Sequence, residues 1–564
     1  MAHYYDETLS RPSSFNFAND VVDYWAHNSS PGPAMHWVSQ DRKTERKLSF
    51  EHFSRQSHRI AVYLQDELGV KAGEKMLVVL PRVPEWWEIA TAAFRSGIVL
   101  CPATTLLVDK DIEYRIHRSS ASVFVGDSVS VQKVLRVRAN CPSLKHIIQS
   151  GTERSPKEAI HFATALSRID QKAAYKGPQP PISAAALIYF TSGTTGNPKM
   201  VQHNHISYPL AHTITGKHWL RLEPGQLYWN LSEQGWAKAA WSFFGAWNCG
   251  AGLFVHDDRE AFSASKTLDI LHSYPITTFC APPTAYRQLV LGEMRAVLQR
   301  KTPKALVHCS GAGEPLNPEV IRLFKESSGL EVCDGYGQTE TVLVCGNFEG
   351  WAIRPGSMGR PSPGVPLCVV DVDGKECGEG DEGDIALKVD LAGGGGFFGV
   401  FDGYLGEHGE LDRRLRDSGE ERWKWYLTGD RATRDKDGYI WFVGRSDDVI
   451  NSSGYRIGPF EVESTLKQHP AVVESAVVSS PEESRGEVVK AFIVLTKEAA
   501  GKDHDRLAKE LQDFCKEHAA PYKYPRKIQF VDAAFLGQYK TISGKTQRKR
   551  LKELEWQGQP KAKL

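Results

Sequence analysis

The stretch Tyr189-Phe190-Thr191-Ser192-Gly193-Thr194-Thr195-Gly196-Asn197-Pro198-Lys199-Met200 decides how the rest of the chain is interpreted. It follows the apolar run 185–188, which is typical of a buried strand. Its glycines leave backbone N–H groups free to curl around an anion, its hydroxyls add donors, and its lysine adds positive charge. The composition predicts a polyphosphate cradle. A flexible surface turn is the alternative, and the loop is not a Walker A loop because Asn197-Pro198 separates Gly196 from Lys199.

Length, charge and cysteine content limit the class of protein. A chain of 564 residues is too long for one core, so at least two domains are expected. A formal net charge of +1 gives no long-range field that favours nucleic acid or an anionic membrane. No apolar run has the roughly 18 residues that a membrane span needs. The ten cysteines lie singly without a CxxC pair, which argues against a zinc ribbon and a disulfide scaffold. We expect no nucleic-acid partner and no integral membrane contact.

The two ends of the chain bear on its location. Residues 1–7 are neither an apolar signal sequence nor an Arg-rich transit peptide. The C-terminal Ala562-Lys563-Leu564 is similar to the Ser-Lys-Leu peroxisomal address. This similarity predicts a peroxisomal protein that contacts a peroxisomal import receptor. A basic tail without signal function, on a cytoplasmic protein, is the alternative.

Helix and strand signals alternate along the first part of the chain. Ser49 is placed to cap a helix that runs to Leu68, and Pro84 opens a helix over 85–95. This β-α-β order predicts parallel sheets with right-handed crossovers. Apolar strands are expected at 75–80, 98–101, 123–125, 146–148, 185–190, 252–255, 277–280 and 305–308.

Four polar, glycine-bearing stretches each follow one of these predicted strands. They are residues 191–199, 281–284, 310–315 and 334–340. Ligands of open α/β sheets bind beyond the carboxyl ends of the strands. Several such stretches at one edge of a sheet therefore predict a ligand pocket, whereas any one alone could be a turn.

The character of the sequence changes after about residue 355. Segments 384–389 and 439–443 predict short antiparallel strands, and residues 472–517 predict a small α+β domain. The expected linker is 444–450, where glycine and adjacent acids interrupt the apolar strands. The sequence thus predicts an α/β protein with a large N-terminal domain at residues 1–446, including a β subdomain, and a C-terminal α+β domain at 447–564.

Seven motifs occur together in the order and spacing of one superfamily. They are YFTSGTTGNPK at 189–199, GAGEP at 311–315, YGQTE at 336–340, YLTGD at 426–430, GRSDDVI at 444–450, SGYRIGPFEVE at 453–463 and SGKTQR at 543–548. Over roughly residues 15–555 the chain resembles the adenylate-forming superfamily, and stretches 15–23 and 335–340 look most like medium-chain acyl-CoA synthetases. The resemblance implies the adenylate-forming enzyme fold with a mobile C-terminal domain, and an ATP-dependent, AMP-forming acid–thiol ligase.

The reaction of that superfamily has two halves. A carboxylate attacks the α-phosphate of ATP to give acyl-AMP and pyrophosphate, and the thiol of coenzyme A then displaces AMP. The carboxylate is itself the nucleophile, so the absence of a G-x-S-x-G elbow from the sequence fits. The implied cofactors and substrates are ATP, Mg²⁺, coenzyme A and a small-molecule carboxylic acid.

The resemblance also implies roles for individual residues. Thr339 would bind the α-phosphate, Glu340 would hold Mg²⁺, and Lys545 would be the catalytic lysine of the first half-reaction. Alone, Lys545 would be taken for a solvated charge. The remaining nucleotide contacts would be Thr191, Ser192, Gly193, Thr194, Thr195, Gly196 and Lys199 at the β- and γ-phosphates; Gly311, Ala312, Gly313, Glu314, Pro315 and Tyr336 at adenine; Asp334, Gly335 and Gly337 elsewhere in the nucleotide site; Asp430 and Arg445 at the ribose; and Arg456 at phosphate.

The second half-reaction implies motion of the small domain. In the superfamily this domain rotates about a hinge, which falls here at Asp447. Lys545 would then leave the site, and Ser453, Gly454 and Tyr455 would line the pantetheine tunnel. Relatives commonly have Pro-Lys-Thr where this chain has Tyr539-Lys540-Thr541, and we expect that difference to change loop stiffness only.

The acid is the least determined part of the reaction. Acetate-type relatives carry tryptophan where this chain has Gly337, and each methylene that the space admits is worth about 0.8 kcal/mol of burial. A short branched, medium-chain or aryl acid is therefore expected rather than acetate. Trp236 would gate the acyl and thiol sides, whereas Trp241, Phe243, Phe244 and Trp247 are mostly expected in the core. An adenylating enzyme that loads a carrier protein, and a non-catalytic nucleotide-binding protein, are the alternatives.

Overall fold

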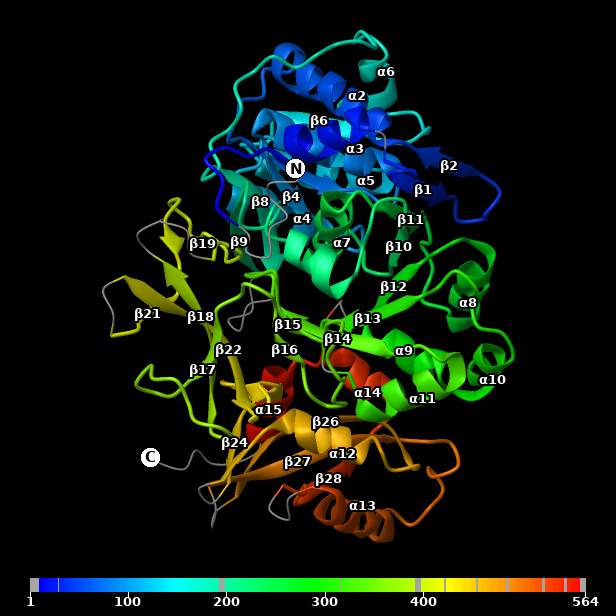
Figure 1. Cartoon of the computed structure of the whole chain (residues 1–564), viewed down its shortest axis with the longest axis vertical. Coiled ribbons are helices and arrows are strands. Elements are labelled where there is room, and N and C mark those ends of the chain that lie inside the picture. Colours follow the sequence, from blue (N-terminus) through cyan, green and yellow to red (C-terminus); the bar gives the residue numbers. More distant parts are fainter. Residues whose placement is uncertain are drawn as a thin grey trace. The chain divides into compact units, whose positions relative to one another are not determined.

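The structure is a computed structural model that forms two compact units. One unit comprises residues 1–366 and 388–426, and the other comprises 367–387 and 427–564 (Figure 1). The predicted domain boundary at 446/447 concerns a hinge and stays a prediction. The described residues are 10–28, 30–191, 198–314, 316–390, 397–419, 422–452, 455–482, 486–519, 523–541 and 545–557.

The first unit contains a nine-stranded sheet in the order β20-β19-β9-β8-β4-β3-β5-β6-β7. Strands β8 to β7 in this order pair in parallel, while β9 and β19 pair antiparallel. The predicted β-α-β rhythm is confirmed here. The strands are β3 (Lys75–Val79), β4 (Val99–Pro102), β5 (Val123–Gly126), β6 (His146–Gln149), β7 (Ile160–His161), β8 (Ala185–Thr191), β9 (Lys199–Asn204), β19 (Gly403–Leu405) and β20 (Leu411–Asp412).

A second nine-stranded sheet of this unit has the order β16-β15-β14-β13-β12-β10-β11-β1-β2. Its six central strands, from β14 to β1, are parallel. The strands are β1 (Met35–Val38), β2 (Glu45–Leu48), β10 (Leu227–Asn230), β11 (Gly252–His256), β12 (Thr278–Ala281), β13 (His308–Ala312), β14 (Val332–Gly337), β15 (Leu343–Gly346) and β16 (Arg360–Pro361).

One predicted strand was wrong in position. The apolar run 305–308 was expected to form it, but β13 begins only at His308, and Val307 is 65% exposed. The small residues Ser310 to Ala312 form the strand instead and are fully buried, because neighbouring strands and Tyr286 pack tightly against them. Apolar content therefore misplaced this strand by several residues.

The helices of the first unit begin where local chemistry predicts. Ser49 caps α2 (Phe50–Val62) by accepting a hydrogen bond from the N–H of His52 at 3.2 Å. Proline occupies the first position of α3 (Pro84–Ser96). The other helical segments are η2 (Phe17–Asp23), α1 (Tyr24–His27), η3 (Tyr63–Glu67), α4 (Asp109–Ser119), α5 (Ser128–Val137), η4 (Arg138–Asn140), α6 (Phe162–Leu166), η5 (Thr215–Trp219), α7 (Ala237–Asn248), α8 (Ala264–Ser273), α9 (Pro283–Leu289), α10 (Gly292–Arg300) and α11 (Pro318–Ser328).

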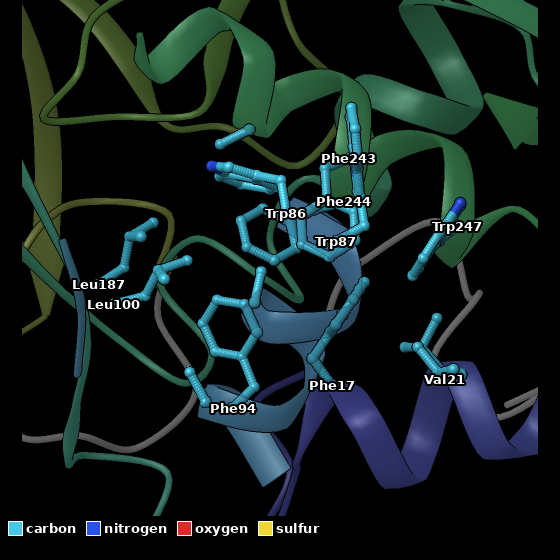
Figure 2. Packing of buried hydrophobic residues seen from close by; sticks show 14 of the residues in the cluster. Phe17, Val21, Trp86, Trp87, Phe94, Leu100, Leu187, Phe243, Phe244 and Trp247 are labelled. Atoms are coloured by element: carbon cyan, nitrogen blue, oxygen red, sulfur yellow. The ribbon is translucent and has the colours of Figure 1, made fainter. Parts of the chain in front are cut away.

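Aromatic side chains of α7 form much of the main core. Figure 2 shows Phe243, Phe244 and Trp247 pointing toward Phe17 and the aromatic face of α3. The rings of Phe17 and Phe244 meet edge to face at 4.9 Å between centroids. The expectation that these three residues belong to the core is confirmed, and α7 is thereby fixed in orientation.

The second unit is built from antiparallel strands and a small α+β part. Strands β18 (Glu382–Asp390) and β22 (Trp423–Arg434) each have residues in both units. The predicted linker 444–450 is the end of one strand, a turn and the start of another. Strand β21 (Leu415–Asp417) belongs to the first unit. The remaining elements of the second unit are β17 (Leu367–Val370), β23 (Ile440–Arg445), β24 (Ile450–Ser452), β25 (Tyr455–Ile457), α12 (Pro459–Leu466), β26 (Val472–Glu482), β27 (Gly486–Leu495), α13 (His504–His518), β28 (Lys527–Phe530), α14 (Ala533–Gln538) and α15 (Arg548–Trp556). Among the described helices, none has the length and apolar character to cross a membrane.

Candidate active site

Three of the four predicted loop stretches lie at one edge of the second sheet. Strands β12, β13 and β14 are parallel neighbours, and their registers place Gly311 beside Asp334 and Ala312 beside Gly335. Gly311 and Ala312 end β13, and Asp334 and Gly335 lie within β14, so all four belong to the strands and not to the loops after them. The fourth stretch, at 191–199, belongs to the first sheet, so the expectation of a single sheet edge was wrong. Pro315 lies outside the described residues.

Asp334 is a buried carboxylate at this edge. It accepts a hydrogen bond from the N–H of Gly335 at 2.9 Å. Burial raises the pKa of the Asp334 carboxyl to about 7. The backbone N–H groups around it and the ammonium of Lys238 lower this pKa, but the effect of burial is larger. Lys238 itself donates to the carbonyl of Ala312 at 2.7 Å. A lysine of α7 is thus tied to the end of β13.

The predicted cradle lies in the sequence between β8 and β9, which pair antiparallel. Its flanking residues Thr191 and Lys199 pair directly with each other. The residues Ser192, Gly193, Thr194, Thr195 and Gly196 lie outside the described part of the chain. What the structure does place is the lysine, which is half-buried at the start of β9.

The backbone carbonyl of Thr339 is bonded to a buried histidine that the sequence analysis did not identify. His203, on β9, bonds through Nε2 to the carbonyl of Thr339 at 2.8 Å. Because a carbonyl only accepts, Nε2 carries the proton, and Nδ1 accepts from the hydroxyl of Ser207 at 3.1 Å. Burial lowers the pKa of His203 to about 3, so the ring is neutral at physiological pH. His203 thus fixes the backbone next to Glu340.

Glu340 is held by a second residue that sequence reasoning missed. The hydroxyl of Tyr404, on β19, donates to Oε1 of Glu340 at 2.7 Å. The N–H of Phe401 donates to the carbonyl of Glu340 at 2.8 Å. The ammonium of Lys199 lies 4.9 Å from the centroid of the Tyr404 ring. Lys199 on β9 and Glu340 in the turn after β14 therefore contact the same tyrosine.

The free space expected beside Gly337 is taken up. A Cβ built on Gly337 would lie 2.4 Å from the carbonyl oxygen of Val342 and 2.8 Å from Cη2 of Trp241. Trp241 is buried, and its indole N–H donates to the hydroxyl of Tyr208 at 2.9 Å. The inference that glycine leaves an open pocket was therefore wrong in its steric reason, because an indole from α7 fills the place of the missing side chain.

Trp236 lies at the start of the same helix. It is half-buried and precedes the first residue of α7. The loop before it is packed closely, since a Cβ on Gly235 would lie 2.2 Å from the backbone nitrogen of Thr104. The hydroxyl of Thr104 also donates to Glu233 at 2.6 Å. The backbone that carries Trp236 is thus fixed on both sides.

The predicted ribose residues are paired within the second unit. Asp430 on β22 faces Arg445 on β23 in register, and their side chains meet at 3.3 Å. The Asp430 carboxylate is buried, whereas Arg445 is partly exposed. Arg445 also lies 3.5 Å from the predicted hinge residue Asp447. A buried carboxylate beside a guanidinium suits an acceptor of hydroxyl hydrogen bonds.

The remaining predicted residues of the second unit are only partly described. Tyr455 and Arg456 are in β25, and Ser453 and Gly454 lie outside the described residues. Lys545 is exposed. Its N–H donates to the hydroxyl of Thr541 at 3.1 Å, and the N–H of Thr541 donates back to its carbonyl at 2.8 Å. These two bonds hold the backbone of Lys545 next to Thr541.

Sheet arrangement and strand-end residues together define the class, an adenylate-forming enzyme. A solved structure of the anthranilate CoA ligase AuaEII, in complex with anthranoyl-AMP, matches with a TM-score of 0.83 at 28% identity, over 97% of this chain and 98% of that one. A benzoate CoA ligase from Burkholderia xenovorans LB400 matches with a TM-score of 0.77 at 26% identity, over 96% and 100% of the two chains. The predicted fold class is confirmed.

The chain belongs to the AMP-binding enzyme family. The family model of the AMP-binding enzyme matches residues 22–405, and that of the AMP-binding enzyme C-terminal domain matches 461–545. The mitochondrial acyl-coenzyme A synthetase ACSM3 of Homo sapiens is 43% identical over 562 residues, which cover 98% of this chain and 91% of that protein. The human mitochondrial acyl-coenzyme A synthetase ACSM5 is 42% identical over 552 residues, 97% and 91% of the two. The chain is an AMP-forming acid–CoA ligase, whose substrates include ATP and coenzyme A.

The predicted peroxisomal location was wrong. The relatives that match over nearly the whole chain are named as mitochondrial proteins. A three-residue C-terminal signal occurs often by chance, so Ala562-Lys563-Leu564 was weak support, and these residues lie outside the described part of the chain. The predicted contact with a peroxisomal import receptor is withdrawn with it.

Proposed function

We propose that the ligase reaction runs on the residues gathered around Thr339 and Glu340, with the phosphates of ATP between Lys199 and Glu340. The observation that carries this proposal is the shared contact of both side chains with Tyr404. A cation and a carboxylate that contact the ring and the hydroxyl of one tyrosine suit a nucleotide with its metal ion. The hydrogen bonds from His203 and Tyr404 hold Thr339 and Glu340 in place before substrate binds.

In the first half-reaction a carboxylate oxygen attacks the α-phosphorus of ATP. The new C–O–P linkage forms as the bond to the β-phosphate breaks, and pyrophosphate leaves. Lys199 neutralises charge on the leaving phosphates. The hydroxyl of Thr339 donates to the α-phosphate, and Lys545 neutralises charge where the acid meets phosphorus. No side chain of the protein becomes covalently modified.

Magnesium suits the donor set around Glu340. The ion prefers octahedral oxygen ligands and is usually held by one or two carboxylates together with substrate phosphates and water. Among the described residues no cluster of three His, Cys, Asp or Glu forms a site of its own. Glu340 has one oxygen engaged by Tyr404, which leaves the other for a cation. Bound there, the ion would neutralise charge on the phosphate oxygens.

In the second half-reaction the sulfur of coenzyme A attacks the acyl carbon. A C–S bond forms, the C–O bond to phosphate breaks, and AMP leaves. The similarity to adenylate-forming enzymes supports a rotation about Asp447 that withdraws Lys545 and brings Ser453, Gly454 and Tyr455 to the pantetheine. Asp430 and Arg445 hold the ribose through both halves, and Arg456 holds phosphate.

The apolar tail of the acid lies toward Gly337 and Trp241. Support comes from the neighbourhood of Gly337, which follows the adenine-binding Tyr336 and is closed by an indole from α7. We infer that Trp241 limits the length of the acid, and that Trp236, half-buried just before α7, gates the acyl and thiol sides. Compact acids, branched or aryl, then fit better than long straight chains.

The test is a panel of C2 to C12 straight, branched and aromatic acids. For each acid, AMP and acyl-CoA are quantified with ATP, Mg²⁺ and coenzyme A present, and with each omitted in turn. The proposal expects equal amounts of AMP and acyl-CoA, with highest kcat/KM for compact acids. Preference for acetate, or for chains of ten or twelve carbons, would contradict the assignment of Trp241.

A further inference from the structure

Strand β19 brings Tyr404 into the phosphate side of the site from a distant part of the sequence. It pairs antiparallel with β9, with Tyr404 opposite Val201 and Leu405 opposite Met200. Lys199, the first residue of β9, therefore lies within two residues of this pairing. The register fixes which ring reaches the lysine.

The segment that leads into β19 is also joined to the strand-end residues around Glu340. Val400 bridges to Thr341, and the N–H of Phe401 donates to the carbonyl of Glu340 at 2.8 Å. Both the backbone and the side chain of Glu340 are thus held by the segment 400–404. A single short segment connects the first sheet to the carboxylate at the edge of the second.

The two parts of the Tyr404 side chain make different contacts. Its hydroxyl donates to Oε1 of Glu340 at 2.7 Å, a charge-assisted hydrogen bond. Its ring lies 4.9 Å from the ammonium of Lys199, within the range of a cation–π contact, and 5.9 Å from the guanidinium of Arg414. The half-buried position of Tyr404 strengthens both contacts relative to a solvated surface.

We propose that Tyr404 is a positioning residue for the ATP phosphates and their cation. Its hydroxyl occupies Oε1 of Glu340 and leaves Oε2 as the oxygen that would hold the cation. Its ring keeps the ammonium of Lys199 on the side of the phosphates. This inference rests on the roles proposed above for Lys199 and Glu340.

The two contacts can be separated by substitution. Tyr404→Phe removes the hydroxyl and keeps the ring under Lys199. Tyr404→Leu removes both. The matched control is Tyr175→Phe, which deletes a phenolic hydroxyl that donates to Oε1 of Gln65 at 3.0 Å, elsewhere in the same unit.

The decisive experiment is calorimetric titration without acid or coenzyme A. Each protein is titrated with Mg-ATP and, separately, with ATP in the presence of EDTA. We expect Tyr404→Phe to weaken Mg-ATP binding about tenfold, the size of one hydrogen bond to a charged group, while metal-free ATP binds as in the wild type. Tyr404→Leu should weaken both, and Tyr175→Phe neither. In steady-state assays KM for ATP should rise in Tyr404→Phe while KM for the acid stays constant.

The outcomes distinguish this inference from the function on which it rests. If the wild type binds metal-free ATP as tightly as Mg-ATP, the proposed role of Glu340 falls. If the wild type prefers Mg-ATP and Tyr404→Phe shows the same preference, the inference about Tyr404 is overturned. It is also overturned if Tyr404→Phe weakens the binding of Mg-ATP and of metal-free ATP by the same factor, because equal weakening indicates general damage to the site.

Discussion

Two ends of one short stretch, Gly337 to Glu340, are held in opposite ways. At the end proposed to bind phosphate, Thr339 and Glu340 are held by directional hydrogen bonds from His203 and Tyr404. At the end proposed to face the acid, the place of a Gly337 side chain is taken by an indole edge and a carbonyl. Hydrogen bonds fix position and direction, whereas ring packing fixes volume. The phosphate end is therefore suited to chemistry common to every acid, and the acyl end to a choice among acids.

The largest effect is expected from Lys545, a residue of the second unit. Its removal tests whether the residues of the first unit alone can neutralise the charge of the phosphates. Lys545→Ala should lower adenylation by about a hundredfold or more, the scale of losing a charge partner in the transition state. Conversion of supplied acyl-AMP to acyl-CoA should be spared. ATP–pyrophosphate exchange measures the first reaction, and thioester formation from synthetic acyl-AMP measures the second. Equal loss of both would refute separate roles in the two halves.

The next largest effect tests the hydrogen bond from His203 to the carbonyl of Thr339. His203→Leu removes the N–H that satisfies the Thr339 carbonyl and should lower kcat for adenylation about twentyfold, with little change in the ranking of acids. The control is His205→Leu, because neither ring nitrogen of buried His205 has a hydrogen-bond partner among the described residues. His205→Leu should keep its rate and gain stability. Similar rates for the two variants would show that the bond to Thr339 is dispensable.

A smaller effect is expected at the acyl end. Trp241→Leu should raise the ratio of kcat/KM for octanoate over butyrate about tenfold, because the space released admits additional methylenes. The variant also loses the hydrogen bond to Tyr208, and Tyr208→Phe removes that acceptor without opening space. Tyr208→Phe should leave the ranking of acids unchanged. An unaltered ranking in Trp241→Leu would place the length limit elsewhere.

The smallest effect concerns the contribution of Asp334, a proposed nucleotide contact, to stability. In the folded state burial raises the pKa of Asp334 from 3.8 to about 7, so between these values the folded protein holds a proton that the unfolded chain releases. Stability therefore falls as pH rises from about 4 to 7 and changes no further above it. Asp334→Asn should remove this slope, so that its Tm exceeds that of the wild type by roughly a few degrees at pH 8 and by less at pH 5. Parallel Tm profiles of the two proteins would contradict the raised pKa.

Sequence predicted the elements better than it predicted their partners. The strands, the Ser49 cap and the fold class follow from local patterns and motif order, which act within short windows of sequence. His203 and Tyr404 carry no motif of the site, because each acts through a partner more than sixty positions away. Only the pairing of β9 with β19 and the sheet edge at β14 bring these contacts together.

Gly337 illustrates a second limit of sequence. The absence of a side chain is visible in the sequence, but the group that takes its place is not. Trp241 was expected mainly as a core residue, like Phe243, Phe244 and Trp247, and its burial agrees. Its indole edge nevertheless meets Gly337, since α7 has one face on the core and one on the strand end. Helical spacing alone does not separate these two faces.

The most direct test of the division between the two ends compares Glu340→Gln with Trp241→Leu in one assay. ATP–pyrophosphate exchange is measured for acids from C2 to C12, with KM for ATP determined for each protein. The account predicts that Glu340→Gln slows every acid by a similar factor with an unchanged ranking, and that Trp241→Leu reorders the acids with an unchanged KM for ATP. A reordering in Glu340→Gln, or a raised KM for ATP in Trp241→Leu, would contradict it.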